Sequence, residues 1–296
     1  MIPVSFSYER ASSIDDAIAK MAAGGGKLIA GGHSLVPLMK LRLSEPGRLI
    51  DIARIPGLSG IRESGPPHDA QSASWGPRGG RIEIGATTTH HEVATSKVLR
   101  DKCPMVAEAA AEIGDAQVRN RGTIGGSIAH ADPAADMPAV MVAADAEIEI
   151  RGKSGTRTVK AADFFQGFYT VDLQASEIIT AIRFAPVRSA AYAKLHQRAS
   201  HYAIIGVAAA LDLEGGVIRA ARVAVTGATT HAMRLADVEK ALAGNKASAD
   251  VVAAASANAG SGIADLNADL HGSAEYRKAM IPVFAKRALE KALARA

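Results

Sequence analysis

The amino-acid sequence predicts an α+β protein made of more than one part. In the first fifth of the chain, short apolar runs alternate with a helix-like segment, and the loops between them are rich in glycine. In the last third, apolar strands come first and alanine-rich helices follow. The chain has 296 residues, which is long enough for two or three subdomains with hydrophobic cores.

Composition excludes several classes of function. The formal net charge is only +4, and no Lys/Arg cluster is interleaved with aromatics, so we expect no nucleic-acid binding. No apolar run reaches the length of a spanning helix, and the N-terminus lacks the pattern of a signal peptide, so we expect a cytoplasmic protein without a membrane span. The single cysteine, Cys103, permits no internal disulfide and cannot supply the usual four thiolates of an iron-sulfur cluster.

The first segments read as an αβ(loop)αβ unit. Ser13, with Asp16 three residues later, is a suitable N-cap for a helix over residues 14–21. The elements that follow are a strand at 27–30, a helix or helical turn at 35–43 and a strand at 48–52, with a subdomain boundary near 55–57.

The middle of the chain is predicted to contain strands and helices around a polar insertion. Residues 65–80, which include Trp75, read as an exposed hairpin loop between strands at 58–62 and 81–85. Thr89 and Glu92 match a capping box at the start of a helix. His90-His91-Glu92 lacks the second histidine of a zinc motif, so we interpret it as structural and expect no metal site. Further helices are predicted at 105–113 and 137–142.

The rest of the chain is predicted to hold a hairpin and then a smaller α+β domain. Residues 146–151 alternate cleanly and start a hairpin that ends at 159, and 177–184 is another strand. We place the last domain boundary at 176/177. The C-terminal elements are strands at 203–213 and 218–225 and helices at 236–242 and 273–296, the last with an apolar stripe of Tyr276, Met280, Val283, Phe284, Ala288 and Leu289.

Two glycine-rich loops are the best candidates for a binding site. One contains Gly31 and Gly32 and follows a short strand, and the other contains Gly125 and Gly126 between Thr123 and Ser127. Glycine allows positive φ and close approach of a ligand to backbone N–H groups, which suits a phosphate. Neither loop matches G-x-G-x-x-G or a P-loop. A Gly-Gly pair alone is more often a buried tight turn, and it is the presence of two such loops that favours a binding site.

These residues resemble a known family. The runs 30–42 (AGGHSLVPLMKLR) and 119–127 (RNRGTIGGS) are similar, in this order and separation, to the FAD-binding medium subunit of the molybdenum hydroxylases, the carbon monoxide dehydrogenase and xanthine dehydrogenase family. The resemblance covers nearly the whole chain. It implies a two-part FAD-binding domain of the PCMH type over residues 1–176, with subdomains of about 1–56 and 57–176. A smaller α+β C-terminal domain, a three-stranded sheet with helices, would span 177–296.

The resemblance also implies the residues that bind FAD. The two loops would hold the diphosphate, Asp136 would make a polar contact, and Ile179 would lie beside the flavin ring. Lys194 would place positive charge at the pyrimidine edge, and Tyr202 would cover a ring face. His33, His130 and Asp132 occupy positions that vary in the family, so the alternative is that they only shape the loops. The full set is Leu28, Ile29, Ala30, Gly31, Gly32, His33, Ser34, Leu35, Ile113, Gly122, Thr123, Ile124, Gly125, Gly126, Ser127, Asp132, Asp136, Ile179, Lys194 and Tyr202.

The expected function is therefore that of a FAD-binding electron-transfer subunit without a catalytic residue of its own. It would accept electrons from iron-sulfur clusters of a small partner subunit, work beside a large molybdopterin subunit, and assemble as a dimer of heterotrimers. Two alternatives stay open, a self-contained FAD-dependent oxidase of the related fold and a cofactor-free scaffold subunit. The sequence indicates neither the substrate nor the final acceptor, which could be a quinone, NAD or oxygen.

Overall fold

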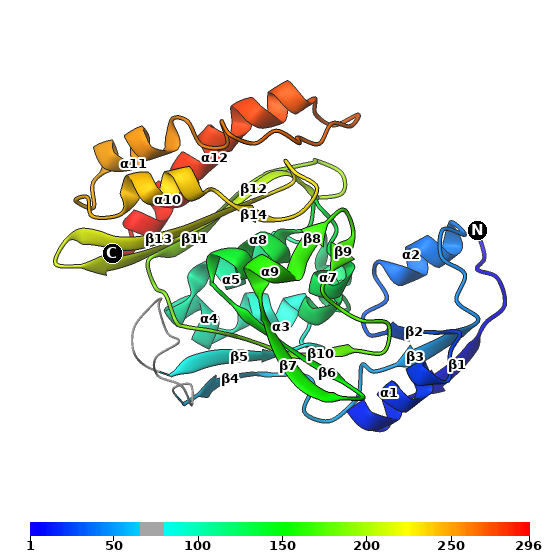
Figure 1. Cartoon of the computed structure of the whole chain (residues 1–296). Coiled ribbons are helices and arrows are strands. Elements are labelled where there is room, and N and C mark those ends of the chain that lie inside the picture. Colours follow the sequence, from blue (N-terminus) through cyan, green and yellow to red (C-terminus); the bar gives the residue numbers. More distant parts are fainter. Residues whose placement is uncertain (66–79) are drawn as a thin grey trace.

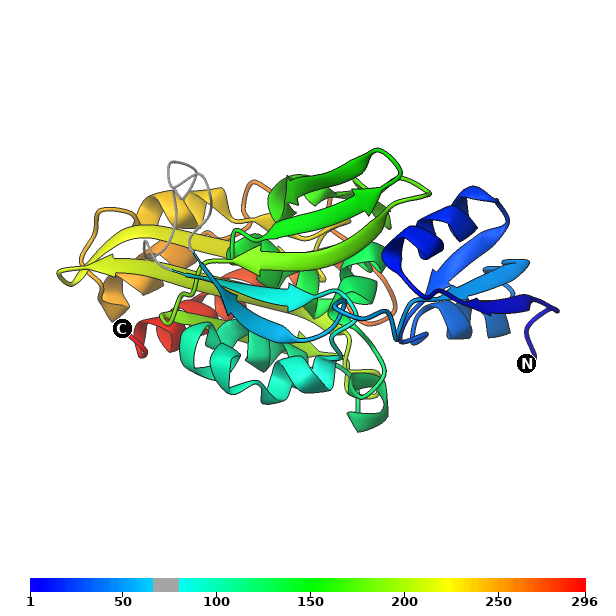
Figure 2. The ribbon, with the colours of Figure 1, turned by 90° about the horizontal axis from the view of Figure 1, so that it is seen from below.

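The computed structural model describes residues 1–65 and 80–296. The chain forms three parts, each built on its own sheet. Figure 1 shows the second part between the C-terminal sheet and the N-terminal part, and Figure 2 shows the N-terminal part standing to one side of the rest. The loop predicted over 65–80, with Trp75, lies outside the described residues except at its two ends.

The first part is a three-stranded parallel sheet in the order β1-β3-β2, with two helices. Ser13 caps the first helix by accepting from the Asp16 N–H at 3.1 Å, as predicted. The strand beginning at Ser7 was not predicted, because its sequence SYER has no apolar alternation. The elements are β1 (Ser7–Arg10), α1 (Ile14–Ala22), β2 (Gly26–Ile29), α2 (Leu35–Lys40) and β3 (Arg48–Asp51).

The second part is a five-stranded antiparallel sheet in the order β4-β5-β10-β6-β7. Its strands are β4 (Ile61–Ser64), β5 (Arg81–Gly85), β6 (Glu147–Gly152), β7 (Gly155–Lys160) and β10 (Ile178–Phe184), and a small separate pair is β8 (Phe165–Gly167) and β9 (Thr170–Val171). The β6–β7 hairpin is confirmed. β10 follows residue 176 in sequence, yet it is hydrogen-bonded between β5 and β6 in this sheet.

Helices of the second part lie between its sheet and the C-terminal sheet (Figure 1). The predicted capping box is present, since the Thr89 hydroxyl accepts from the Glu92 N–H and the Glu92 carboxylate accepts from the Thr89 N–H. The helices are α3 (His90–Thr95), α4 (Lys97–Lys102), α5 (Pro104–Ala111), α6 (Ala116–Arg119), α7 (Ile124–His130), α8 (Asp136–Ala143) and α9 (Ala161–Phe164).

The third part is an antiparallel sheet in the order β11-β12-β13-β14, with helices on its outer face (Figure 1). The fourth strand has only two residues and adds to the three-stranded sheet that the resemblance implied. The helix over 249–256 was not predicted. The elements are β11 (Ala190–His196), β12 (Ala203–Glu214), β13 (Val217–Thr226), β14 (Met233–Arg234), α10 (Ala236–Leu242), α11 (Ala249–Ser256) and α12 (Ala274–Leu293).

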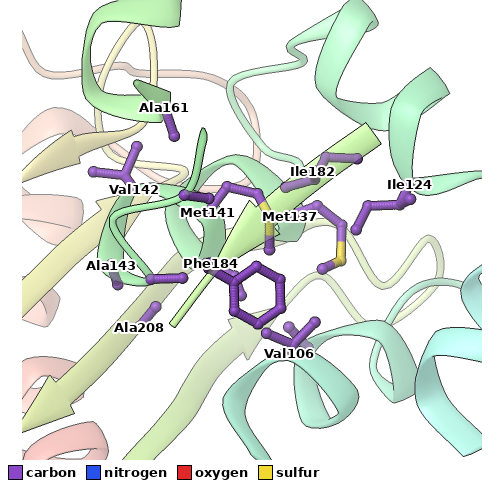
Figure 3. Packing of buried hydrophobic residues seen from close by; sticks show 14 of the residues in the cluster. Val106, Ile124, Met137, Met141, Val142, Ala143, Ala161, Ile182, Phe184 and Ala208 are labelled. Atoms are coloured by element: carbon purple, nitrogen blue, oxygen red, sulfur yellow. The ribbon is translucent and has the colours of Figure 1, made fainter. Parts of the chain in front are cut away.

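The central core joins the second and third parts. Met137 and Met141 of α8 pack with Val106 of α5 and Phe184 of β10 (Figure 3), and Ala208 of β12 belongs to the same cluster. β12 is buried on both faces, because its alternate residues pack on α8 and on α12, which explains its unbroken apolar sequence. Among the described residues, no helix is both long and apolar enough to cross a bilayer.

Candidate functional site

A cavity of about 580 Å³ lies where the three parts meet. Its wall contains the loop between β2 and α2, the start of α7, the segment between β9 and β10, and residues 200–202 before β12. Most residues assigned through the family resemblance line it, although Ile124 and Lys194 do not. Those that do are Leu28, Ile29, Ala30, Gly31, Gly32, His33, Ser34, Leu35, Ile113, Gly122, Thr123, Gly125, Gly126, Ser127, Asp132, Asp136, Ile179 and Tyr202.

The first glycine loop requires both of its glycines. Gly32 has φ +74°, a conformation that side chains rarely adopt. At Gly31 a Cβ would overlap the carbonyl oxygen of Arg121, so the two glycine loops touch each other directly. Ser34 caps α2 without a side-chain hydrogen bond to the helix. Its hydroxyl therefore remains available to a ligand, whereas the Val36 N–H already donates to the Gly32 carbonyl at 2.9 Å.

The second glycine loop differs from the prediction. Gly125 and Gly126 lie in the first turn of α7 and do not have positive φ, so the expected conformational role was wrong for both. Thr123 caps the helix by accepting from the Gly126 N–H at 3.2 Å. The Gly125 N–H donates to the Ala86 carbonyl at 2.8 Å, and the Ile124 N–H donates to the Thr88 carbonyl at 3.0 Å.

These internal hydrogen bonds change what the second loop can offer to an anion. The N–H groups of residues 124–126 already have acceptors, so hydroxyl groups must supply most of the donors on this side. Ser127 lines the cavity and carries such a hydroxyl. The Ile124 side chain is fully buried in the core beside Met137 (Figure 3). Gly125 is needed for packing, because a Cβ there would lie 2.6 Å from the Cβ of Ala86.

Asp136 is a buried acid in the cavity wall. It is the first residue of α8 and is 5% exposed. Its carboxylate accepts from the Tyr192 hydroxyl at 2.5 Å and from Lys194 Nζ at 2.8 Å. Burial raises the pKa of this carboxyl, while Lys194 and the Tyr192 hydrogen bond oppose that rise.

Lys194 therefore lies one layer behind the cavity wall. Its side chain is 0% exposed, and Nζ also donates to the Glu112 carbonyl at 3.1 Å. The resemblance implied a cation at the pyrimidine edge of the flavin. In the structure Lys194 pairs with Asp136, which lines the cavity, whereas Lys194 does not line it. A charge in this place can act on a ligand through Asp136.

Aromatic residues surround the mouth of the cavity. Tyr202 lines it and is 48% exposed, which suits a residue that covers part of a ligand. The Tyr169 hydroxyl donates to the Asp132 carboxylate at 3.2 Å, and the Tyr169 ring lies 5.0 Å from the His130 ring. Asp132 also accepts from the Ala134 N–H at 2.9 Å. Asp132 and His130 therefore shape the rim of the cavity as well as lining it.

Two buried polar residues of the wall were missed by the sequence analysis. Thr87 Oγ1 and His90 Nδ1 have no hydrogen-bond partner within the described residues. Burial, and then the charge of His33, lower the pKa of His90 to about 4, so its ring is neutral at pH 7. Both lie in a run interpreted as a helix start. A sequence pattern identifies the cap but not the cavity beside it.

The sequence also contains no indication of a second stretch of the cavity wall, the connection between β9 and β10 together with the strand residues at its two ends. It brings apolar and polar side chains to the cavity, and its sequence contains no glycine pair, metal-ligand spacing or charge cluster that would indicate a site. Only the tertiary fold reveals its position. The residues are Val171, Leu173, Gln174, Ala175, Glu177 and Ile178.

Comparison with known proteins gives two family matches that together span most of the chain. Residues 4–186 match the family described as the FAD binding domain in molybdopterin dehydrogenase, and residues 190–292 match the CO dehydrogenase flavoprotein C-terminal domain. The carbon monoxide dehydrogenase medium chain of Hydrogenophaga pseudoflava is 39% identical over 100% of this chain and 99% of its own length. The glyceraldehyde dehydrogenase medium chain of Sulfolobus acidocaldarius is 35% identical over 98% and 99%.

Solved structures show the same fold. A chain of carbon monoxide dehydrogenase from Hydrogenophaga pseudoflava superposes with a TM-score of 0.90 at 39% identity, covering 100% of both chains. A chain of quinoline 2-oxidoreductase from Pseudomonas putida 86 gives a TM-score of 0.88 at 30% identity, covering 99% of both chains. The similarity therefore extends over all three parts that enclose the cavity.

Proposed function

This chain belongs to the family of FAD-binding medium subunits of molybdenum-containing dehydrogenases, and we propose that it binds FAD in the central cavity and transfers electrons within a multi-subunit enzyme. Its relatives are named as dehydrogenase or hydroxylase subunits, so the family consists of oxidoreductase components. The observation that carries the proposal is the meeting of the two glycine loops at a cavity lined by apolar residues and one buried, ion-paired acid.

The cavity has the features that FAD requires. Its volume of about 580 Å³ lies within the range of about 300–1,000 Å³ that is usual for ligand sites. The contact between Gly31 and Arg121 leaves no room for a Cβ, which keeps backbone donors at the surface. Thr87 and His90 add two polar side chains to this wall.

Different regions of the wall would hold different regions of the cofactor. The backbone around Gly32, with Ser34 and Ser127, would donate to the diphosphate. Asp136 would accept from a hydroxyl or a ring N–H. Ile113 and Ile179 would pack on apolar surface. When bound, FAD supplies the redox centre, which accepts electrons and passes them on.

The chain would depend on partners for the remaining redox centres. Cys103 is fully buried, and burial raises the pKa of its thiol to about 12, so it is an unreactive core residue. Iron-sulfur clusters would therefore be carried by another subunit. The family resemblance implies a small iron-sulfur subunit and a large molybdopterin subunit, assembled as a dimer of heterotrimers. The rim around His33, Asp132 and Tyr202 would face the iron-sulfur subunit.

The test starts with the flavin content of the purified protein and continues with stopped-flow mixing. We expect a flavin spectrum with one FAD per chain and no reduction of the isolated flavin-loaded chain by the substrate of the complex. Adding the two partner subunits should restore bleaching of the flavin band. Rapid reduction of the chain alone would favour the self-contained oxidase, and a chain without flavin in every assembly state would favour the scaffold.

A further inference from the structure

Asp136 has both carboxylate oxygens bound by side chains from a different part of the molecule. Tyr192 donates to Oδ1 and Lys194 donates to Oδ2. Both donors come from β11, and because they are two residues apart they point to the same face of the strand. The ionisation and orientation of Asp136 in the cavity wall therefore depend on the C-terminal sheet.

The structure assigns Tyr192 and Lys194 as positioning residues that hold Asp136 as an ionised, fixed acceptor for the cofactor. This inference rests on the proposed function, since it concerns how the same cavity recognises FAD. Neither residue lines the cavity. Both act through Asp136, which does.

The packing around Tyr192 indicates that its hydroxyl has a dedicated place. Gly206 on β12 lies opposite Lys194 in the strand register. A Cβ at Gly206 would overlap the Tyr192 hydroxyl, so glycine leaves the space that this group occupies. The hydroxyl is thereby directed at Asp136, and the tyrosine side chain is only 1% exposed.

The electrostatics give this arrangement a function beyond packing. An isolated buried carboxyl would take up a proton and become a donor, and burial does raise the pKa of Asp136. Among the groups that oppose this rise in the pKa of Asp136, Lys194 has the largest effect. Glu112 and Tyr202 also face the site, and burial raises the pKa of both. Neither of them supplies positive charge, so Lys194 is the cation that favours the carboxylate, and the Tyr192 hydroxyl supports it by donating a hydrogen bond.

The experiment measures FAD affinity against pH in the full chain, purified with any subunits that accompany it and stripped of flavin. FAD is titrated by fluorescence quenching between pH 5.5 and 9. We expect Lys194→Met to move the pH midpoint of binding upward by about one to three pH units, as expected when an adjacent cation is removed from a carboxylate. Binding should recover as the pH rises. Tyr192→Phe should move the midpoint in the same direction by less.

Two further variants act as references. Asp136→Asn should bind FAD weakly and show no corresponding step with pH, because it lacks the titrating group. Lys286→Met removes a lysine of α12 that pairs with Glu290 and is 49% exposed, and its profile should match that of the wild type. Circular dichroism of each variant reports whether it is folded. If Lys194→Met does not fold, the comparison of Tyr192→Phe with Asp136→Asn still tests whether the residues of β11 position Asp136.

The outcomes separate this inference from the function on which it rests. Wild-type protein that binds no FAD at any pH would overturn the proposed function, and the inference with it. Wild-type protein that binds FAD, with folded Lys194→Met or Tyr192→Phe showing the wild-type midpoint, would overturn only the positioning role. A purely structural role would weaken binding equally at every pH.

Discussion

Gly125 and Gly126 are adjacent residues with different surroundings, and this difference separates folding from binding. Gly125 is buried against Ala86, whereas Gly126 is exposed and a Cβ there would approach only the Thr123 hydroxyl. We predict that Gly125→Ala lowers the free energy of unfolding by about 1–3 kcal/mol, the usual cost of overpacking. Gly126→Ala should cost less stability.

The two glycine variants are compared by urea unfolding without flavin and by FAD titration. Gly126→Ala should weaken FAD binding more than it weakens the fold, because its Cβ lies at the cavity surface. Equal stability of the two variants would contradict the packing role of Gly125.

His90 gives a prediction for the pH dependence of stability. Its pKa is lowered from 6.5 to about 4 by burial, so the unfolded chain binds the proton more readily than the folded one. Stability should therefore be full above pH 6.5 and fall as the pH drops toward 4. At pH 4.5 this single group should cost about 2.5 kcal/mol. His90→Gln should lose less stability than the wild type between pH 7 and 4.5 in urea unfolding. Equal losses would show that His90 does not titrate in this way.

Lys194 shows what a sequence can and cannot predict about one residue. The family resemblance placed a cation near the cofactor, and the structure does place it within 2.8 Å of an acid in the cavity wall. Its direction depends on the pairing of β11 with β12 and on the packing of β11 against α5, which are long-range features. Local sequence contains no information about either of them.

At the scale of elements, helix caps and apolar alternation were sufficient to predict those helices and strands that their own local sequence determines. Ser13 and Thr89 cap the helices predicted to follow them, and Ser273, the first residue of the predicted helix 273–296, is the N-cap of α12. α12 is a helix as predicted, but Tyr276 and Val283 of its predicted stripe are exposed. The buried face includes Phe284, Ala288 and Leu289 of that stripe. It also contains residues that the predicted stripe left out, among them Ile281, Ala285 and Ala292.

α7 shows the opposite case, in which tertiary contacts outweigh propensity. A Gly-Gly pair disfavours helix, so the prediction for residues 123–127 is a glycine-rich loop. The Thr123 cap and the hydrogen bond from the Gly125 N–H to Ala86 hold the helix in place. The cap could have been recognised from Thr123, whereas the contact with Ala86 could not.

At the scale of the whole molecule, the cavity is shared among segments that are far apart in sequence. β10 completes the middle sheet late in the chain. β11 then supplies the partners of Asp136. The order of the strands determines which segments reach the cavity wall. The segment 171–178 could therefore not have been identified as part of the wall from its own residues.

Because the cavity is formed by all three parts of the chain, we predict that residues 4–186, which match the FAD-binding family, are not sufficient to bind FAD. A fragment ending at residue 186 would lack the sheet that covers α5 and α8, and Asp136 would lose both Tyr192 and Lys194 as partners. The apolar faces of α5 and α8 would then be exposed to water, which destabilises the fragment. We therefore expect the fragment to bind a hydrophobic dye, to be cleaved rapidly by protease and to retain no FAD, whereas the full chain resists cleavage. A protease-resistant fragment that keeps one FAD would show that the C-terminal sheet is dispensable for the site.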